Sequence, residues 1–230
     1  MKFLFKYPSR SRPELFKKIM NRYQNYLSGD HEYEFIVSLD NNDSTMNNPE
    51  IKKFLKGYDN VSFYYGDNKS KISAINADID KAKSDWDILF LISDDMVPRV
   101  KGLDNTIAQN MSAFFPEKDA LLHYNDGRVG KRLVTLTVMG RKMYDNFGYI
   151  YHPDYISLWC DNEQTEVAKS SKKYKYFDIV LVHHDWHGSV KDKKRDKLYT
   201  RNEGYFRIDK LMYEKRKRYG FPKNSVKNMP

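Results

Sequence analysis

The chain has 230 residues, a formal net charge of +9, 40% hydrophobic residues and 15% aromatic residues, which suits one globular domain with tails and excludes a disordered chain. The single cysteine, Cys160, excludes an internal disulfide and a cluster of thiolate metal ligands. No stretch approaches the roughly 20 apolar residues of a membrane helix, and residues 1–13 lack a signal-peptide pattern, so we expect a soluble cytoplasmic protein.

Strands and helices are predicted to alternate along the first hundred residues. Apolar or alternating runs predict strands at residues 2–6, 34–39, 61–65 and 88–92. Helical spacing predicts helices at residues 15–26, 51–55 and 71–83, and prolines introduce the first two. This alternation predicts an α/β fold with a mixed, mainly parallel sheet flanked by helices, whose ligands gather at the carboxyl ends of the strands.

The second half of the chain has a less regular pattern. Further strands are predicted at residues 121–124, 133–139 and 177–183, and the last of them runs into the sequence HHDWHG. A basic helix is predicted over residues 205–219. We therefore divide the chain into a domain of residues 1–190 and a basic C-terminal tail of residues 191–230, which is helical and packs on or beside the domain.

Two adjacent acids, Asp94 and Asp95, end the hydrophobic run DILFLISDDMVP of residues 87–98. Paired carboxylates at the end of a central strand offer hard oxygen ligands to a divalent cation, whereas acids in an edge-strand turn would simply be solvated. The polar loops that follow the first four predicted strands should meet at one edge of the sheet. This convergence favours a metal and nucleotide site.

Six motifs follow one another in a defined order. They are YPSRSRPE at residues 7–14, SLDNND at 38–43, DNKSKISAIN at 67–76, LISDDMVP at 91–98, WCDNEQTE at 159–166 and VHHDWHG at 182–188. Together they resemble the GT-A class of nucleotide-sugar glycosyltransferases, particularly the inverting, family-two-like type. The resemblance implies a GT-A-like, Rossmann-type catalytic domain over residues 1–190. It also implies metal-dependent transfer of a sugar from a nucleoside-diphosphate sugar, first of all a UDP-sugar, to a glycan or other hydroxyl acceptor with inversion.

The acidic motif has two interchangeable assignments under this resemblance. Asp95 takes the metal, and Asp94 reaches the ribose or shares the metal. Because Ser93 stands where the usual Asp-any-Asp motif has its first acid, these two roles can be exchanged. Donor contacts are expected from further residues that provide hydroxyl, carboxylate, amide or cationic groups, namely Ser9, Arg10, Asp40, Lys71 and Asn76.

Histidines at the end of the last predicted strand are additional candidate metal ligands. Carboxylates suit Mg²⁺ or Mn²⁺, and an imidazole shifts the preference towards Mn²⁺. Strand alternation turns either His183 or His184 inward, and we favour His184 as a metal or diphosphate contact with His187 second. A purely structural role is expected for at least one of the three.

Inversion requires a group that removes the proton of the acceptor hydroxyl as that oxygen attacks the sugar. The candidates are Asp161 and Glu163. We favour Asp161, since it follows the apolar run YISLWC and lies at a predicted helix start. Helix capping is the alternative role for an aspartate at this position, and both roles are compatible.

Lysine and arginine are concentrated at residues 169–175 and 191–223, which should attract anionic partners. The tail would then contact an anionic membrane peripherally, or an anionic polymer, unless it simply packs over the domain. A nucleic-acid-binding module that uses the tail and aromatic residues is an alternative, although the loop acids would repel a phosphate backbone. A nucleotidyltransferase is a third possibility, and the absence of a Gly-rich N-terminal phosphate loop argues against it.

Overall fold

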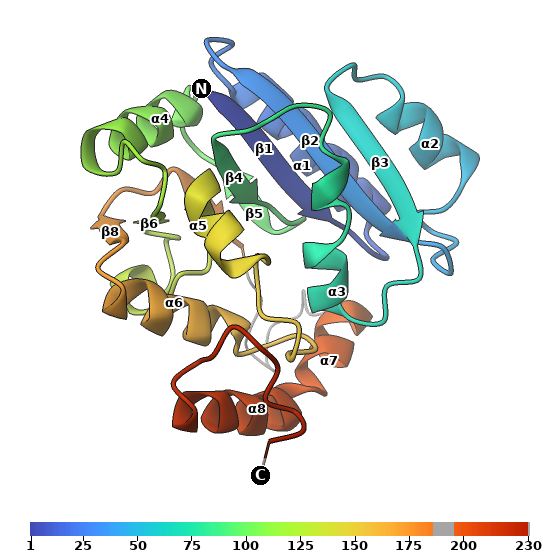
Figure 1. Cartoon of the computed structure of the whole chain (residues 1–230). Helices are drawn as coiled ribbons and strands as arrows, with labels where there is room; N and C mark the ends of the chain where they lie inside the picture. The colour runs from blue at the N-terminus through green and yellow to red at the C-terminus, as the bar shows by residue number, and fades with distance from the viewer. Residues whose placement is uncertain (186–195, 230) are drawn as a thin grey trace.

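The computed structural model describes residues 1–185 and 196–229. Within these ranges a seven-stranded sheet has the strand order β3-β2-β1-β4-β7-β6-β8 (Figure 1). Four strands pair in parallel and form one half of this sheet: β1 (Lys2–Pro8), β2 (Glu32–Asp40), β3 (Val61–Gly66) and β4 (Ile88–Leu91). The mainly parallel sheet expected from the first hundred residues is therefore confirmed.

The other half of the sheet is mixed. Strand β7 (Val138–Gly140) runs antiparallel to β4 and to β6 (Leu121–Tyr124), and β8 (Tyr174–Phe177) runs parallel to β6. The strand predicted over residues 133–139 is thus shorter and lies later than expected. A local run of apolar residues indicates burial, but tertiary pairing decides which of those residues enter the ladder.

A second, two-stranded sheet joins β5 (Met96–Pro98) to β9 (Val182–His184) in antiparallel register. The strand predicted over residues 177–183 is therefore wrong in extent, because the chain leaves the main sheet at the end of β8 and pairs again only at Val182. The acidic motif lies between β4 and β5. This small sheet consequently brings the histidines of β9 beside the acids that precede β5.

Helices cover both faces of the parallel half-sheet. Helices α1 (Pro13–Tyr26), α2 (Pro49–Leu55) and α4 (Leu103–Phe114) pack on one face, where side chains such as Phe16, Ile51 and Ile107 are buried. Helix α3 (Lys71–Asn76) packs on the other face through Ile72 and Ile75. In Figure 1, α3 and α5 (Arg141–Phe147) lie in front of the sheet and α1 lies behind it. The layers are those of an α/β domain.

Helix α3 is shorter than the predicted helix of residues 71–83, and the 3₁₀ turn η1 (Ile79–Lys81) follows it. Asp78 separates the two elements in a left-handed backbone conformation, with φ of 65°. Its carboxylate accepts hydrogen bonds from Ser38 at 2.5 Å and from Lys81 at 2.6 Å. The α-helix ends early because Asp78 is bonded across to β2, which helical spacing alone does not reveal.

Lys6 of β1 is completely buried beneath this turn. Its ammonium group donates to the hydroxyl of Ser38, which in turn donates to Asp78. Burial lowers the pKa of Lys6 to about 7, and the negative charge of Asp78 opposes that shift. The protein thus contains an amine that titrates near neutral pH inside its core.

We expect Lys6→Met to alter the pH dependence of stability. The unfolded lysine has a pKa of 10.5 and the folded one a pKa of about 7, so the unfolded state binds more protons between these values. The free energy of unfolding of the wild type should therefore rise relative to that of Lys6→Met as pH increases from neutral to mildly alkaline. Urea unfolding at both pH values measures this difference. Lys18→Met changes an exposed lysine and is the control: the difference in free energy of unfolding between the wild type and this variant should not change with pH. The same pH dependence for both variants would contradict a buried, neutral Lys6.

The C-terminal segment forms α7 (Lys197–Glu203) and α8 (Phe206–Arg218), which confirms the predicted basic helical tail. Arg216 is fully buried between α8 and α6 (Cys160–Ser170), where its guanidinium group donates to both carboxylate oxygens of Glu163 at 2.6 and 2.8 Å. It also pairs with Asp154 at 3.2 Å. Helix α8 is therefore anchored to the domain by internal charge pairs.

Among the described residues, no helix combines the length and the apolar composition that crossing a bilayer requires.

Candidate functional site

Asp94 connects the loop after β4 to the loop after β1. Its buried carboxylate accepts hydrogen bonds from the hydroxyls of Tyr7 at 2.9 Å and Ser9 at 3.0 Å. Burial raises the pKa of Asp94 to about 7, the bond from Tyr7 opposes this shift, and the neighbouring charge of Asp95 adds to it. The carboxyl group of Asp94 thus fixes the loop that contains Ser9 against the acidic motif.

Asp95 has different surroundings from Asp94. Its carboxylate accepts hydrogen bonds from the hydroxyl of Ser93 and from the hydroxyl of Tyr199, which belongs to α7. Burial alone would raise the pKa of Asp95, but the interaction with His184 and these two hydroxyl donors hold that pKa well below its usual range. Asp95 is consequently the carboxylate of the pair that is ionised at neutral pH.

The imidazole of His184 lies between two carboxylates. Its Nε2 is 3.7 Å from Oδ1 of Asp95, and its Nδ1 is 4.0 Å from Oδ2 of Asp126. Asp126 is buried, and its other oxygen accepts hydrogen bonds from the backbone N–H groups of residues 128–130. An outer carboxylate of this kind commonly orients a metal-binding histidine. The sequence analysis did not identify Asp126, although its position just after β6 was an available signal.

His183, the neighbour of His184 in β9, points elsewhere and bonds to Asp185, with 2.6 Å between Nδ1 and Oδ1. Its ring packs directly on Gly127, where a Cβ atom would lie 2.2 Å from the ring, and Gly127 also has φ of +77°. Only glycine therefore permits this contact. The other histidine proposed as a metal ligand, His187, lies outside the described residues.

Asp95 and His184 provide a carboxylate oxygen and an imidazole nitrogen, a donor pair that fits Mn²⁺ and, for the oxygen, Mg²⁺. Across the described ranges, no set of three histidine, cysteine, aspartate or glutamate side chains is arranged to hold a metal ion. A cation held by Asp95 and His184 would therefore need ligands besides the described histidine, cysteine, aspartate and glutamate side chains. The oxygens of a bound diphosphate would be suitable ligands.

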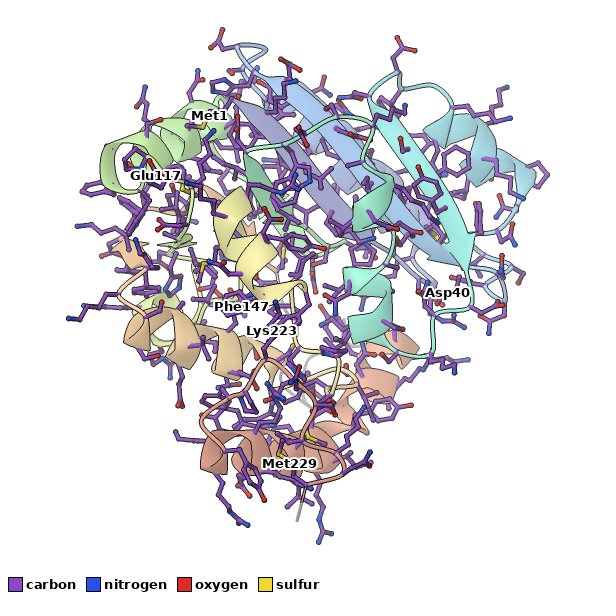
Figure 2. All side chains as sticks on the ribbon, in the orientation of Figure 1. Met1, Asp40, Glu117, Phe147, Lys223 and Met229 are labelled. Carbon is purple, nitrogen blue, oxygen red and sulfur yellow. The ribbon has the colours of Figure 1, made fainter. Side chains whose placement is uncertain are left out.

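The loops after β1 and β2 are connected by polar contacts. Arg10 pairs with Asp40 and donates to Asn42 at 2.8 Å, and Asn68 donates to the second oxygen of Asp40 at 2.9 Å. Asp43 accepts the backbone N–H of Ser11 at 2.7 Å. Figure 2 shows Asp40 near the carboxyl ends of β2 and β3. The structure thus brings together Arg10 and Asp40, two of the residues expected to contact the donor.

Helix α7 contacts the loop that follows β1. Arg12 forms a two-point ion pair with Asp196, at 2.7 and 3.0 Å, and its guanidinium group lies over the ring of Tyr199 at 4.4 Å. Asp196 is also the N-cap of α7, because its side chain accepts the N–H of Tyr199. The tail therefore reaches the acidic motif, which the sequence analysis did not foresee.

Asp161 lies in the first turn of α6, as expected from its position in the sequence. Burial raises the pKa of Asp161, while the charges of Lys71 and His184 oppose the shift. The N-cap of α6 is Trp159, whose φ is 64°, so Asp161 does not occupy the capping position. The two charges that act on Asp161 thus come from two other segments of the chain, α3 and β9.

Glu163 and Asn76 are occupied by structural contacts. Besides Arg216, Glu163 accepts the hydroxyl of Tyr155 at 2.7 Å. The amide of Asn76 donates to the carbonyl of Tyr151 at 2.6 Å and accepts the N–H groups of Ile150 and Tyr151 at 2.9 and 3.1 Å. Both side chains hold chain segments together. Glu163 is therefore not proposed as the base, and Asn76 is not proposed as a donor contact.

Comparison with known proteins gives matches at the level of structure. A scan against protein-family models and a search of curated proteins find no match. The chain is similar in structure to TarS 1-349 of S. aureus, with a TM-score of 0.58 and 14% identity over 80% of this chain and 60% of that one. It is also similar to the mannosyltransferase PcManGT from Pyrobaculum calidifontis, solved with GDP-Man and Mn²⁺, with a TM-score of 0.63 and 10% identity over 92% and 61%.

The chain has the GT-A fold of nucleotide-sugar glycosyltransferases. It spans about three fifths of the length of both matched proteins, 60% and 61%. A 4-diphosphocytidyl-2C-methyl-D-erythritol synthase from Anaerococcus prevotii is similar too, with a TM-score of 0.55 and 9% identity over 89% of this chain and 96% of that one. The fold is thus common to glycosyl transfer and nucleotidyl transfer.

Proposed function

We propose that the protein is a metal-dependent glycosyltransferase that moves a sugar from a nucleoside-diphosphate sugar, a UDP-sugar in the first instance, to a hydroxyl acceptor with inversion. The observation that carries the proposal is the carboxylate of Asp95 in the loop after β4, with its Oδ1 3.7 Å from the imidazole Nε2 of His184. The GDP-Man and Mn²⁺ bound by PcManGT support it, as does the UDP-GlcNAc bound by TarS.

Asp95 and His184 would hold a divalent cation, which supplies Lewis-acid stabilisation of the leaving diphosphate when bound. Asp94 and Ser9 fix the neighbouring loop, and Asp94 remains an alternative metal or ribose contact. Cationic side chains near the loops would bind phosphate oxygens, with Arg10 and Lys71 as the leading candidates. Asp40 would contact the base or ribose.

Asp161 is the proposed general base. It would take the proton of the acceptor hydroxyl as that oxygen forms a bond to the anomeric carbon, while the bond from this carbon to the diphosphate oxygen breaks. Burial raises the pKa of Asp161 and so strengthens its carboxylate as a proton acceptor. The positive charge of Lys71 lowers the pKa of Asp161 and so opposes the effect of burial.

We expect Asp161→Asn to lose transfer activity by about 10²- to 10⁴-fold while it still binds the donor, because the amide cannot accept the proton. Product formation measures the first effect, and thermal stabilisation by a nucleotide sugar with Mn²⁺ measures the second. Glu166→Gln is the control on the same helix, where Glu166 pairs with Lys217 at 2.8 Å, and it should retain transfer. Equal loss of donor binding in Asp161→Asn would contradict the role of base.

A nucleotidyltransferase is the second candidate, favoured by the structural match that covers 96% of the Anaerococcus prevotii synthase. A screen of nucleotide sugars and nucleoside triphosphates with Mn²⁺ or Mg²⁺ separates the two reactions. Release of a nucleoside diphosphate from a nucleotide sugar supports glycosyl transfer. Release of pyrophosphate from a nucleoside triphosphate in the presence of a sugar phosphate would refute glycosyl transfer.

We further propose that the protein acts in the cytoplasm and that its basic tail provides contact with an anionic membrane or polymer. The carboxylates of Asp40, Asp95 and Asp161 would repel a nucleic-acid backbone from the candidate site, so nucleic acid is a less suitable partner there.

A further inference from the structure

Helix α8 has an outward side that combines apolar and basic residues. Ile208 is 54% exposed and Leu211 is 58% exposed. The opposite side of the helix is fixed to the domain, because Asp209 accepts the backbone N–H groups of residues 156–158 and Arg216 is buried against Glu163. The exposed apolar side chains are therefore held outward by the packing of the rest of the helix.

Basic residues surround Leu211 at helical spacing. Arg207, Lys215 and Arg218 lie four residues before it, four after it and seven after it, so with Ile208 they occupy one stripe about 100° wide. We call these five residues, Arg207, Ile208, Leu211, Lys215 and Arg218, the outer face of α8. Figure 1 shows α8 at the bottom of the view, below α6, and Figure 2 places Met229 beside it.

The charges of the outer face are largely free to meet an external partner. Arg207 and Arg218 form no ion pair with any residue that the structure describes, whereas Lys217 pairs with Glu166 and Lys210 with Glu214. Lys215 is tied to the C-terminal segment instead, because it donates to two backbone carbonyls there, at 3.2 and 2.5 Å. A cationic surface that also exposes apolar side chains, with Leu211 inside the stripe and Ile208 at its edge, is complementary to anionic lipid headgroups above an apolar layer.

We propose that the outer face of α8 binds the surface of a bilayer that contains anionic lipids. Arg207 and Arg218 contact the headgroups, and Ile208 and Leu211 enter the boundary between headgroups and acyl chains. A soluble polyanion would engage the arginines but would offer no apolar layer for Ile208 and Leu211, so the apolar residues favour the membrane. This proposal is independent of the reaction that the candidate site performs.

Binding of the full chain to lipid vesicles tests the proposal by co-sedimentation. The protein should bind vesicles of phosphatidylcholine mixed with phosphatidylglycerol and should not bind vesicles of phosphatidylcholine alone. The double variants Ile208→Glu with Leu211→Glu, and Arg207→Gln with Arg218→Gln, should each bind at least about tenfold more weakly. Leu15→Glu is the matched control, because Leu15 is 46% exposed on α1, and it should bind like the parent.

Three results would overturn the proposal. The first is equal binding of the parent to neutral and mixed vesicles, and the second is absence of binding to both. The third is undiminished binding by the variant that carries glutamate at positions 208 and 211, since that result would identify a site for polyanions only. Circular dichroism and thermal unfolding of each variant verify that the exposed substitutions leave the fold intact.

Discussion

Asp95→Ala should abolish the metal-dependent turnover of a nucleotide sugar, with a loss of rate of about 10²- to 10³-fold or more. The reason is that Asp95 combines an ionised carboxylate with a position 3.7 Å from the imidazole of His184. Alanine removes the oxygen ligand and leaves the Nε2 side of the imidazole without its carboxylate. Release of nucleoside diphosphate, followed across a titration with Mn²⁺, measures the effect.

Asp59→Asn provides a control for Asp95→Ala, because Asp59 is an exposed acid in the turn that precedes β3. This variant should keep the activity and the Mn²⁺ dependence of the parent. Calorimetric titration of Asp95→Ala with Mn²⁺ and donor completes the test. If this variant bound cation and donor as tightly as the parent, Asp95 would not be a metal ligand.

Arg216→Met should lower the free energy of unfolding by about 3–5 kcal/mol, which is a large part of the stability of a single domain. The guanidinium group of Arg216 is fully buried and neutralises two acids, Glu163 and Asp154. Methionine occupies a similar volume but leaves the carboxylate of Glu163 buried without its cation, and Asp154 keeps the more distant cation of Lys227, at 3.7 Å. Urea unfolding followed by circular dichroism measures the change.

The exposed Arg218, two residues further along the same helix, supplies the matched variant Arg218→Met, which should change the free energy of unfolding by no more than about 0.5 kcal/mol. A variant at position 216 that proved as stable as this control would show that the buried charge pairs do not hold α8 to the domain.

The parallel half of the sheet could be predicted because its signals are local. Apolar runs, helix-starting prolines and polar loops place β1 to β4 and helices α1 and α2 with errors of about two residues. Features that depend on contacts between distant parts of the chain could not be predicted from local sequence patterns. Asp78 ends α3 through a bond to Ser38, and β9 pairs with β5 instead of the main sheet. In both cases the determining contact joins residues that are far apart in the chain.

The candidate site was predictable in the same limited sense. Asp94, Asp95 and Asp40 were identifiable because each follows a predicted strand. Two other participants, Asp126 and Tyr199, were not identified, since their importance depends on where His184 and α7 lie. The sequence favoured Asp161 over Glu163 by position alone, and the structural role of Glu163 became visible only through Arg216, which lies 53 residues after it in the chain.

The contact between Gly127 and His183 offers a way to rank distant relatives of this chain. A sequence with a larger residue aligned to Gly127 has no room for the histidine ring and must therefore position the strand that carries His184 differently. The identity of this single residue would then separate proteins that share only the architecture from those that retain the same histidine geometry.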